Sequence, residues 1–416
     1  MSELLALLGG PKVKAVPFTT GKRFTENEVR EVTEVLQGNS LFYANGGKTS
    51  KLEAKMCRMY GSKYAIASSS GTAGIHCAVA ALGIGPGHEV LVPAVTDMGS
   101  VIGILYQGAI PVFVDVDMDT FNFDISDFEK KITKRTKAVQ VVHYMGNPCD
   151  MDEILRIARE NNIFVIEDCA QSAYARYNGK LVGTMGDIGC FSINDFKHIS
   201  SGEGGICITN DAQLASKIRL YSDKAYDRES ESVKFSEFLA PNYRISELCS
   251  AIAVAQLDKL DLLVARRNHI AQAISNAIAD VNGIYPMQVK EGSFCSYWYY
   301  LIRLEENEFG ASRDIFVEAL NAEGIPCSGS HTPVPVYEYG VFKNLNAFPG
   351  SKYPFISKDL DNNYSYENPD CPNAQKLLDK TVKIVISEFY SDGDTEDICK
   401  AIQKIAKYYS KGEKDA

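Results

Sequence analysis

Short apolar runs and amphipathic stretches alternate through the middle of the chain. The apolar runs, rich in Val and Ile, lie at 89–95, 110–116, 138–143, 164–168, 188–193 and 205–209. Between several of them the apolar residues recur at helical spacing, as in DMDEILRIARENN at 150–162. Nearly continuous apolar strands that alternate with helices are typical of a mainly parallel sheet covered by helices on both faces. We therefore expect an α/β fold whose ligands bind beyond the carboxyl ends of the strands.

The flanking segments predict further helices and a second, smaller unit. Residues 24–60 show helical spacing, with one apolar stripe formed by Val29, Val32, Val35 and Leu36. Past residue 245 the pattern predicts, in order, a long helical stretch, a strand at 296–304, a helix at 313–323, an irregular run at 344–370 and a last helix with Asp394 as its N-cap. We predict a large α/β domain over 1–260, which includes an N-terminal segment, and a smaller α+β domain over 261–416.

Length and charge exclude two classes of partner. The 416 residues are more than one hydrophobic core usually supports, which agrees with two domains. The net charge is -10, whereas a surface that binds nucleic acid needs an excess of Lys and Arg. No apolar run reaches the roughly 18 residues of a membrane span, and the first residues lack the basic region and cleavage site of a secretion signal. We expect a cytoplasmic protein that contacts neither nucleic acid nor membrane.

The cysteines and histidines predict no metal site. The 11 Cys residues are scattered singly without a C-x-x-C pair, and the 6 His residues show no metal-ligand spacing. We expect reduced, mostly buried thiols.

A first chemical signal is the run SSSGTAGIHC at 68–77, ahead of an apolar helix predicted over 73–82. A helix N-terminus presents free backbone N–H groups and a partial positive charge, which suit a phosphate. Ser70, Gly71 and Thr72 would cap this helix and let a phosphate approach. A plain N-cap beside a small-residue packing site explains the run equally well.

Asp168 is the second signal, since it ends the apolar run FVIED. A carboxylate at the carboxyl end of a strand can pair with a protonated ring nitrogen, as pyridoxal phosphate (PLP) chemistry requires. The alternative is a helix cap or a surface acid.

Lys197 is the third signal. It lies in a polar turn between two buried strands, where glycines at 202, 204 and 205 permit a tight reversal. A lysine that attacks a carbonyl must be neutral, so it belongs in a partly desolvated cleft. Ser192, five residues earlier, could donate to a phosphate or bond to backbone within the strand. Taken alone, a lysine at this place would more often be a solvated turn lysine.

Together, in this order, the three signals carry a family resemblance. The chain resembles the DegT/DnrJ/EryC1/StrS sugar aminotransferases within the fold type I PLP enzymes, from about residue 10 to 408. The matching segments include SSGT at 69–72, ALGIGPGHEVLVPAVT at 81–96, HYMGNPCDMD at 143–152, IEDCAQSAYARYNGKLVGTMGDIGCFS at 166–192 and PNYRISELCSAIAVAQL at 241–257.

The resemblance implies a role for each site residue. Lys197 forms the internal aldimine and shuttles protons, Asp168 bonds the pyridine nitrogen, and Gln171 lies near the ring. Ser70, Gly71, Thr72 and Ser192 hold the phosphate. Asn242 and Arg244 reach the phosphate of a neighbouring subunit's cofactor, since family members are homodimers with shared sites. The implied reaction moves an amino group from glutamate or glutamine, through PLP and its amine form PMP, to a keto-sugar or keto-cyclitol.

Several positions depart from the family pattern or have two interpretations. Asp97 stands where most relatives carry a ring-stacking aromatic residue, so either Met98 covers the ring or Asp97 faces the substrate. His331 is either a substrate contact or an exposed loop histidine. His198 either tunes the pKa of Lys197 or packs on the turn. Trp298 is expected mainly in the core, and Arg266 and Arg267 on a solvated helix face.

Two other functions stay open. One is a PLP enzyme of another reaction type, such as dehydration, although relatives with that activity carry His in place of the lysine. The other is a non-catalytic regulatory protein, which would need neither Lys197 nor Asp168.

Overall fold

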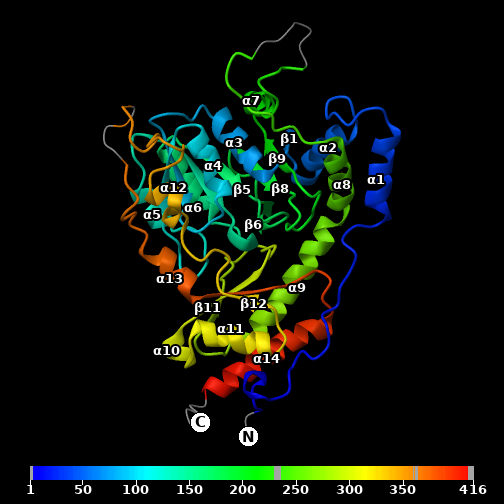
Figure 1. The fold of residues 1–416 in the computed structure, drawn as a ribbon, viewed down its shortest axis with the longest axis vertical. Helices are drawn as coiled ribbons and strands as arrows, with labels where there is room; N and C mark the ends of the chain where they lie inside the picture. Colours follow the sequence, from blue (N-terminus) through cyan, green and yellow to red (C-terminus); the bar gives the residue numbers. More distant parts are fainter. Residues whose placement is uncertain (1–2, 229–235, 359, 361–363, 411–416) are drawn as a thin grey trace.

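The computed structural model describes residues 3–228, 236–358, 360 and 364–410. Its centre is a seven-stranded sheet (Figure 1) in the order β1-β9-β8-β5-β4-β2-β3. The strands are β1 (Tyr64–Ser68), β2 (Glu89–Pro93), β3 (Ile110–Val114), β4 (Thr136–Val142), β5 (Phe164–Asp168), β8 (Ile188–Ser192) and β9 (Gly205–Thr209). All neighbours pair in parallel except β9, which is antiparallel to β8 and β1. The predicted α/β fold class is confirmed.

Helices cover both faces of the sheet, because alternate residues of its strands enter separate cores. In β1 and β9, Ile66 and Cys207 belong to the core that contains α3, whereas Ala65 and Ile206 belong to the core that contains α2 and α8. The helices of this part are α2 (Lys48–Tyr60), α3 (Gly71–Ala81), α4 (Gly99–Tyr106), α5 (Ile125–Lys130), α6 (Met151–Glu160), α7 (Ala212–Ser222) and α8 (Glu247–Gln256). A hairpin of β6 (Arg176–Tyr177) and β7 (Lys180–Leu181) follows β5.

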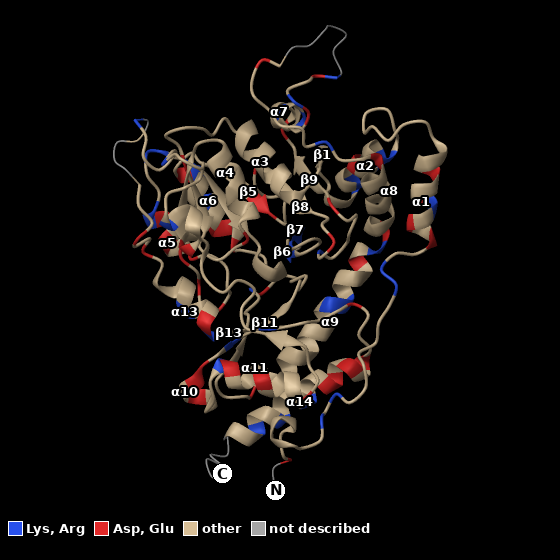
Figure 2. Ribbon diagram, in the orientation of Figure 1, with Lys and Arg blue, Asp and Glu red and all other residues tan. Residues whose placement is uncertain are grey.

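The predicted helical segment 24–60 is two helices, and two of the four residues of its apolar stripe face outward. Helix α1 (Glu26–Gln37) contacts α8, and non-helical residues separate it from α2. Val29 and Leu36 are 64% and 63% exposed, while Glu28 and Glu31 are buried. Lys259 pairs with Glu28, and Lys48 pairs with Glu31; Figure 2 shows charged residues of both signs on α1 and α2. Val35 of the same stripe is buried, so only part of the stripe packs against the rest of the chain.

A second, antiparallel sheet lies below the first in Figure 1, in the order β10-β11-β13-β12. Its strands are β10 (Ile284–Pro286), β11 (Tyr300–Leu304), β12 (Cys327–Ser328) and β13 (Thr381–Ile384). The accompanying helices are α9 (Leu260–Ile278), α10 (Glu306–Phe309), α11 (Arg313–Ala322), α12 (Gly340–Lys343), α13 (Pro372–Lys380) and α14 (Asp392–Ser410). Short 3-10 helices lie at Ala6–Leu8, Tyr144–Gly146, Leu257–Lys259 and Val336–Glu338.

The predicted N-cap of the last helix is wrong by three residues. Ser391 Oγ accepts from the Asp394 N–H at 3.1 Å, and Asp394 Oδ2 accepts from the Ser391 N–H at 2.8 Å. This reciprocal pair is a capping box in which Ser391 is the cap.

Contacts cross the predicted domain boundary at residue 260 in both directions. Glu323 accepts from the backbone of Ala6 and Val13, so the N-terminal segment is bound to the second sheet's helices. Conversely, the Tyr366 hydroxyl donates to the Pro111 carbonyl of β3. The division into 1–260 and 261–416 stays a prediction. Within the described ranges, none of the helices combines the length and hydropathy that crossing a bilayer requires.

Candidate active site

A cavity of about 540 Å³ lies between the carboxyl ends of β5 and β8, the start of α3 and the second sheet. That volume is within the range of small-molecule sites, about 300–1,000 Å³. The predicted site residues that line the cavity are Ser70, Gly71, Thr72, Asp97, Asp168, Gln171, Ser192, Lys197 and His331. The structure therefore brings together the three separate signals of the sequence.

The start of α3 forms an anion cradle beside the end of β8. Ser70 caps the helix, its Oγ accepting from the Ala73 N–H at 3.0 Å. The N–H groups of the helix's first residues have no partner within the helix, so they can donate to a bound anion. A Cβ on Gly71 would lie 2.7 Å from Ser192 Cβ, so only glycine permits this close approach. Helix N–H groups and the hydroxyls of Thr72 and Ser192 are the donors that a phosphate prefers.

Asp168 is a buried carboxylate at the opposite side of the cavity. Its Oδ2 accepts from the Ser100 hydroxyl at 2.7 Å and its Oδ1 from the Ala170 N–H at 3.0 Å. Burial raises the pKa of Asp168, and these two hydrogen bonds and the charge of Lys197 oppose the rise. A buried carboxylate with few charged neighbours is stabilised by a ligand that brings its own positive charge, such as a protonated ring nitrogen.

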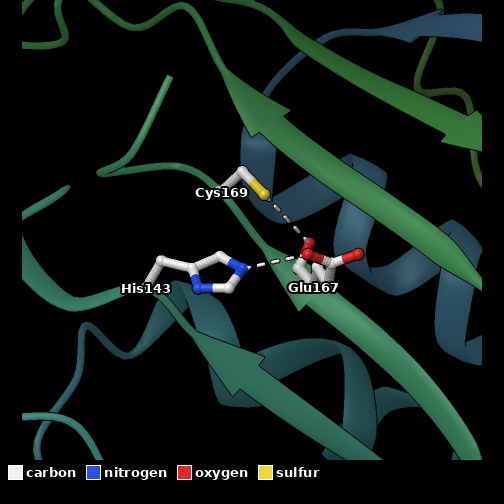
Figure 3. Close-up of side chains that lie close together, drawn as sticks. All are labelled: His143, Glu167 and Cys169. Atoms are coloured by element: carbon white, nitrogen blue, oxygen red, sulfur yellow. Dashed lines mark hydrogen bonds and ion pairs between the residues drawn. The ribbon is translucent and has the colours of Figure 1, made fainter. Parts of the chain in front are cut away.

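A hydrogen-bonded network supports the end of β5 that carries Asp168 (Figure 3). His143, Glu167 and Cys169 lie close enough together to suit a metal ion. The ligand atoms are already occupied: the Glu167 carboxylate accepts from His143 Nε2 and from the N–H groups of Gly183, Met185 and Gly186. His143 Nδ1 accepts from the Cys149 N–H. Burial also raises the pKa of the Cys169 thiol, so we assign the cluster to strand positioning.

Lys197 projects into the cavity under conditions that favour its neutral form. Burial lowers the pKa of Lys197, and the negative charges of Asp168 and Asp97 oppose this shift. The Lys197 Nζ lies 3.7 Å from the centroid of the Trp298 ring. Trp298 is buried as the sequence predicts, but it also lines the cavity, a role that the prediction of a core residue missed.

The turn that carries Lys197 is held by two residues distant in sequence. The Arg23 guanidinium donates to the backbone carbonyls of Asp195 and Lys197, and Trp298 Nε1 donates to the Phe196 carbonyl at 2.7 Å. Arg267 in turn donates to the Trp298 carbonyl at 3.0 Å, so its predicted place on a solvated helix face is wrong. No sequence motif distinguishes Arg23.

Substitution of Trp298 by Phe is expected to lower turnover about 10-fold, because small misplacements of a reacting group are costly. Phe keeps a ring over Lys197 but removes the N–H that holds the Phe196 carbonyl. Turnover and the pH dependence of the visible absorbance band of the lysine-bound cofactor are the measurements. Trp298→His, which restores a ring N–H, should recover part of the loss; equal activity of Trp298→Phe and the wild type would contradict this role.

His198 is buried beside Lys197, and its burial predicts that the free energy of unfolding depends on pH. Its Nε2 lies 3.1 Å from the Ser296 carbonyl. Burial, with the nearby charge of Arg267, lowers the pKa of His198 to about 3. Below its ordinary pKa of about 6.5 the unfolded chain binds a proton that the native state refuses, so stability falls as the pH falls.

From pH 7 to pH 5 this one group is expected to cost about 2 kcal/mol of unfolding free energy. Urea denaturation of the wild type and His198→Asn at both pH values measures it, and the variant should lose less stability than the wild type. His269, which is exposed, provides the matched control His269→Asn. Equal losses in the wild type and His198→Asn would refute the assignment.

Asp97 and His331 occupy the side of the cavity nearest the second sheet. Asp97 is exposed within it and accepts from the Gly99 N–H at 2.7 Å, whereas Met98 packs against the core. The His331 ring lies 5.0 Å from that of Trp298, and its Nδ1 is buried without a hydrogen-bond partner among the described residues. Burial, with the charges of Lys383 and Lys197, lowers the pKa of His331 to about 4. The imidazole is therefore neutral at pH 7.

Asn242 and Arg244 lie away from the cavity of their own chain. Arg244 Nη1 pairs with Asp223 Oδ1 at 2.5 Å, and Asn242 forms a backbone bridge with Asp223. Their predicted contact with a phosphate requires the site of another subunit and stays a prediction.

Comparisons with known proteins agree with the site. Residues 22–403 match the model of the DegT/DnrJ/EryC1/StrS aminotransferase family. The chain is 32% identical over 390 residues to the spore coat polysaccharide biosynthesis protein SpsC of Bacillus subtilis, covering 92% of this chain and 95% of SpsC. It is 37% identical over 282 residues to the GDP-perosamine synthase of Escherichia coli O157:H7, covering 68% and 75% of the two chains. The X-ray structure of an aminotransferase from Psychrobacter cryohalolentis superposes with a TM-score of 0.84 at 28% identity, over 95% of this chain and 100% of that one.

The fold and the donor set of the cavity define a PLP-dependent aminotransferase of fold type I. The chain belongs to the DegT/DnrJ/EryC1/StrS aminotransferase family. The cavity fits the cofactor, because the α3 cradle suits its phosphate, Asp168 its ring nitrogen and Lys197 its aldehyde carbon.

Proposed function

We propose that the chain transfers an amino group from glutamate or glutamine to a keto-sugar or keto-cyclitol, with Lys197 and Asp168 as the catalytic residues. The observation that carries the proposal is the single cavity in which Lys197, Asp168 and the start of α3 meet. Bound PLP supplies an electron sink for the bond that breaks at the substrate carbon.

Each residue then has a distinct task. Burial lowers the pKa of the Lys197 amine. The neutral amine takes a proton from the carbon of the amino donor and later gives a proton to the carbon of the acceptor that receives the amino group. The Asp168 carboxylate holds positive charge on the ring nitrogen. Gly71, Thr72 and Ser192 bind the phosphate, and Gln171, whose Oε1 accepts from the Met145 N–H at 2.9 Å, borders the ring.

Two observations support a sugar-like acceptor, one from the cavity wall and one from the relatives. Asp97 and His331 present polar atoms to the cavity, and polar groups of this kind recognise sugar hydroxyls. The name of the relative GDP-perosamine synthase refers to a nucleotide-linked amino sugar. We infer that Asp97 and His331 contact the acceptor.

The test is covalent labelling followed by a spectral titration. Borohydride reduction of the holoenzyme, followed by peptide mass spectrometry, should label Lys197. Addition of glutamate or glutamine should then remove the visible absorbance band, and a panel of keto-sugars and inososes should restore it. A label on another lysine, or on none, would contradict the proposal. An absorbance band that no amino acid removes would favour another PLP reaction, such as dehydration.

We also propose a homodimer with shared sites. The exposed stripe of Val29 and Leu36 on α1 is apolar surface that a second copy could cover, and Arg244 has no access to its own cavity. Mixed dimers of Lys197→Ala and Arg244→Ala chains should regain activity that neither variant has, since one intact site forms across the interface. Monomers in sedimentation experiments, or no recovery on mixing, would contradict this arrangement.

A further inference from the structure

The second sheet adjoins the active-site cavity through Tyr299, directly before β11, and His331, shortly after β12. Tyr300, Ile302 and Ile384 point to the face that is buried in the main hydrophobic core. Lys383 in β13 lies directly opposite Leu301 and Ser328 in the neighbouring strands, so these side chains share the other face. Tyr299, which directly precedes β11, lines the cavity.

Lys383 is a half-buried cation on this face. Its Nζ lies 4.8 Å from the centroid of the Tyr299 ring. In the part of the chain that the structure describes, no carboxylate forms an ion pair with it, and burial alone lowers the pKa of Lys383. By contrast, the similarly or more buried Lys14, Lys48 and Lys131 each pair with an Asp or a Glu. Lys383 therefore has charge available for a ligand.

His331 links this cation to the catalytic lysine. Its ring centroid lies 5.9 Å from that of Tyr299 and 5.0 Å from that of Trp298, and Trp298 covers the Lys197 Nζ. The unpartnered Nδ1 of His331 is buried at this place. The Lys383 ammonium therefore lies against the ring of Tyr299, and Tyr299 and His331 line the cavity that contains Lys197.

We propose that Lys383, His331 and Tyr299 form a subsite for a substrate carboxylate. A carboxylate supplies the negative charge that Lys383 lacks and accepts hydrogen bonds from an ammonium, an imidazole N–H and a phenol. Every amino-acid donor and its keto-acid product carry such a group, and so does an acidic sugar acceptor. The proposal rests on the transamination proposed above, which supplies these two sources.

Calorimetry with unreactive carboxylates tests the subsite without any group transfer. Holoenzyme is titrated with glutarate, which resembles an amino-acid donor without the amine, and with glucuronate, with glucose as its neutral counterpart. Lys383→Met is expected to weaken binding of the carboxylate about 10- to 100-fold, the usual effect of losing a charged hydrogen bond. Lys383→Arg should keep most of the affinity. The control is Lys400→Met, on the exposed face of α14.

The results distinguish the two possible sources of the carboxylate, the amino-acid donor and an acidic sugar acceptor. Weaker glutarate binding in Lys383→Met assigns the subsite to the donor, and weaker glucuronate binding with unchanged glucose binding assigns it to an acidic acceptor. Unchanged affinity for both carboxylates overturns the proposal. Fluorescence of Trp298, the only tryptophan in the chain, should change on binding if the carboxylate sits in this corner. Whether the proposed transamination itself is wrong is tested separately, by the borohydride label at Lys197.

Discussion

Replacement of Lys197 by Ala is expected to reduce the transamination rate at least about 10³-fold, because we propose the residue as both the covalent anchor and the proton carrier. The variant should still bind PLP, since the α3 cradle and Asp168 remain, but without the absorbance of the lysine-bound form. Single-turnover spectroscopy with glutamate measures the rate, and equilibrium dialysis measures the retained cofactor.

Lys180→Ala is the matched control, because Lys180 is exposed on β7 outside the cavity. It should leave the rate and the spectrum unchanged. If Lys197→Ala instead kept more than a tenth of the wild-type rate while folded, the catalytic role of Lys197 would be wrong.

The second large effect is expected for Asp168→Asn, with a rate loss of about 10²–10³-fold, as for removal of a preorganised electrostatic group. Asn has the same shape and its amide oxygen can still accept from Ser100 or Ala170, so the fold should persist. The negative charge that holds the ring nitrogen protonated is lost. The measurements are the rate of the glutamate half-reaction and the affinity for PLP.

Asp187→Asn serves as control, since Asp187 is an acid outside the cavity whose carboxylate accepts from the Val165 N–H. It should affect stability more than rate. Equal rates for Asp168→Asn and the wild type would show that the carboxylate does not support the cofactor.

The regular elements were largely predictable because local patterns determine them. Strands β5 and β9 have the predicted bounds, and α3 and α11 differ from their predicted bounds by at most two residues. Strand β1 was not predicted, since its five residues YAIAS adjoin the small-residue run of the cradle and show little pattern of their own. Periodicity did not reveal that Glu28 and Glu31 of α1 are buried, because their Lys partners come from other parts of the chain.

The residues of the candidate site likewise fall into those that the sequence predicts and those that only the structure reveals. Ser70, Gly71, Thr72, Asp168, Ser192 and Lys197 follow directly from strand ends and a helix start, where an α/β sheet collects its ligands. Arg23 is 174 residues from the carbonyl of Lys197 that it binds, and Trp298 is 102 residues from the carbonyl of Phe196. The sequence shows no link between such positions.

By itself, the sequence of this protein determined the α/β class, the order of cradle, acid and lysine, and the chemistry that those residue types can perform. Local periodicity, turn residues and capping encode these features within a few positions of each other. Only the tertiary structure decided that Arg23 and Trp298 hold the lysine turn, that Lys383 forms no ion pair with any residue that the structure describes, and that Val29 and Leu36 face outward. Those features depend on packing between distant segments, where burial and available partners determine the position of each side chain.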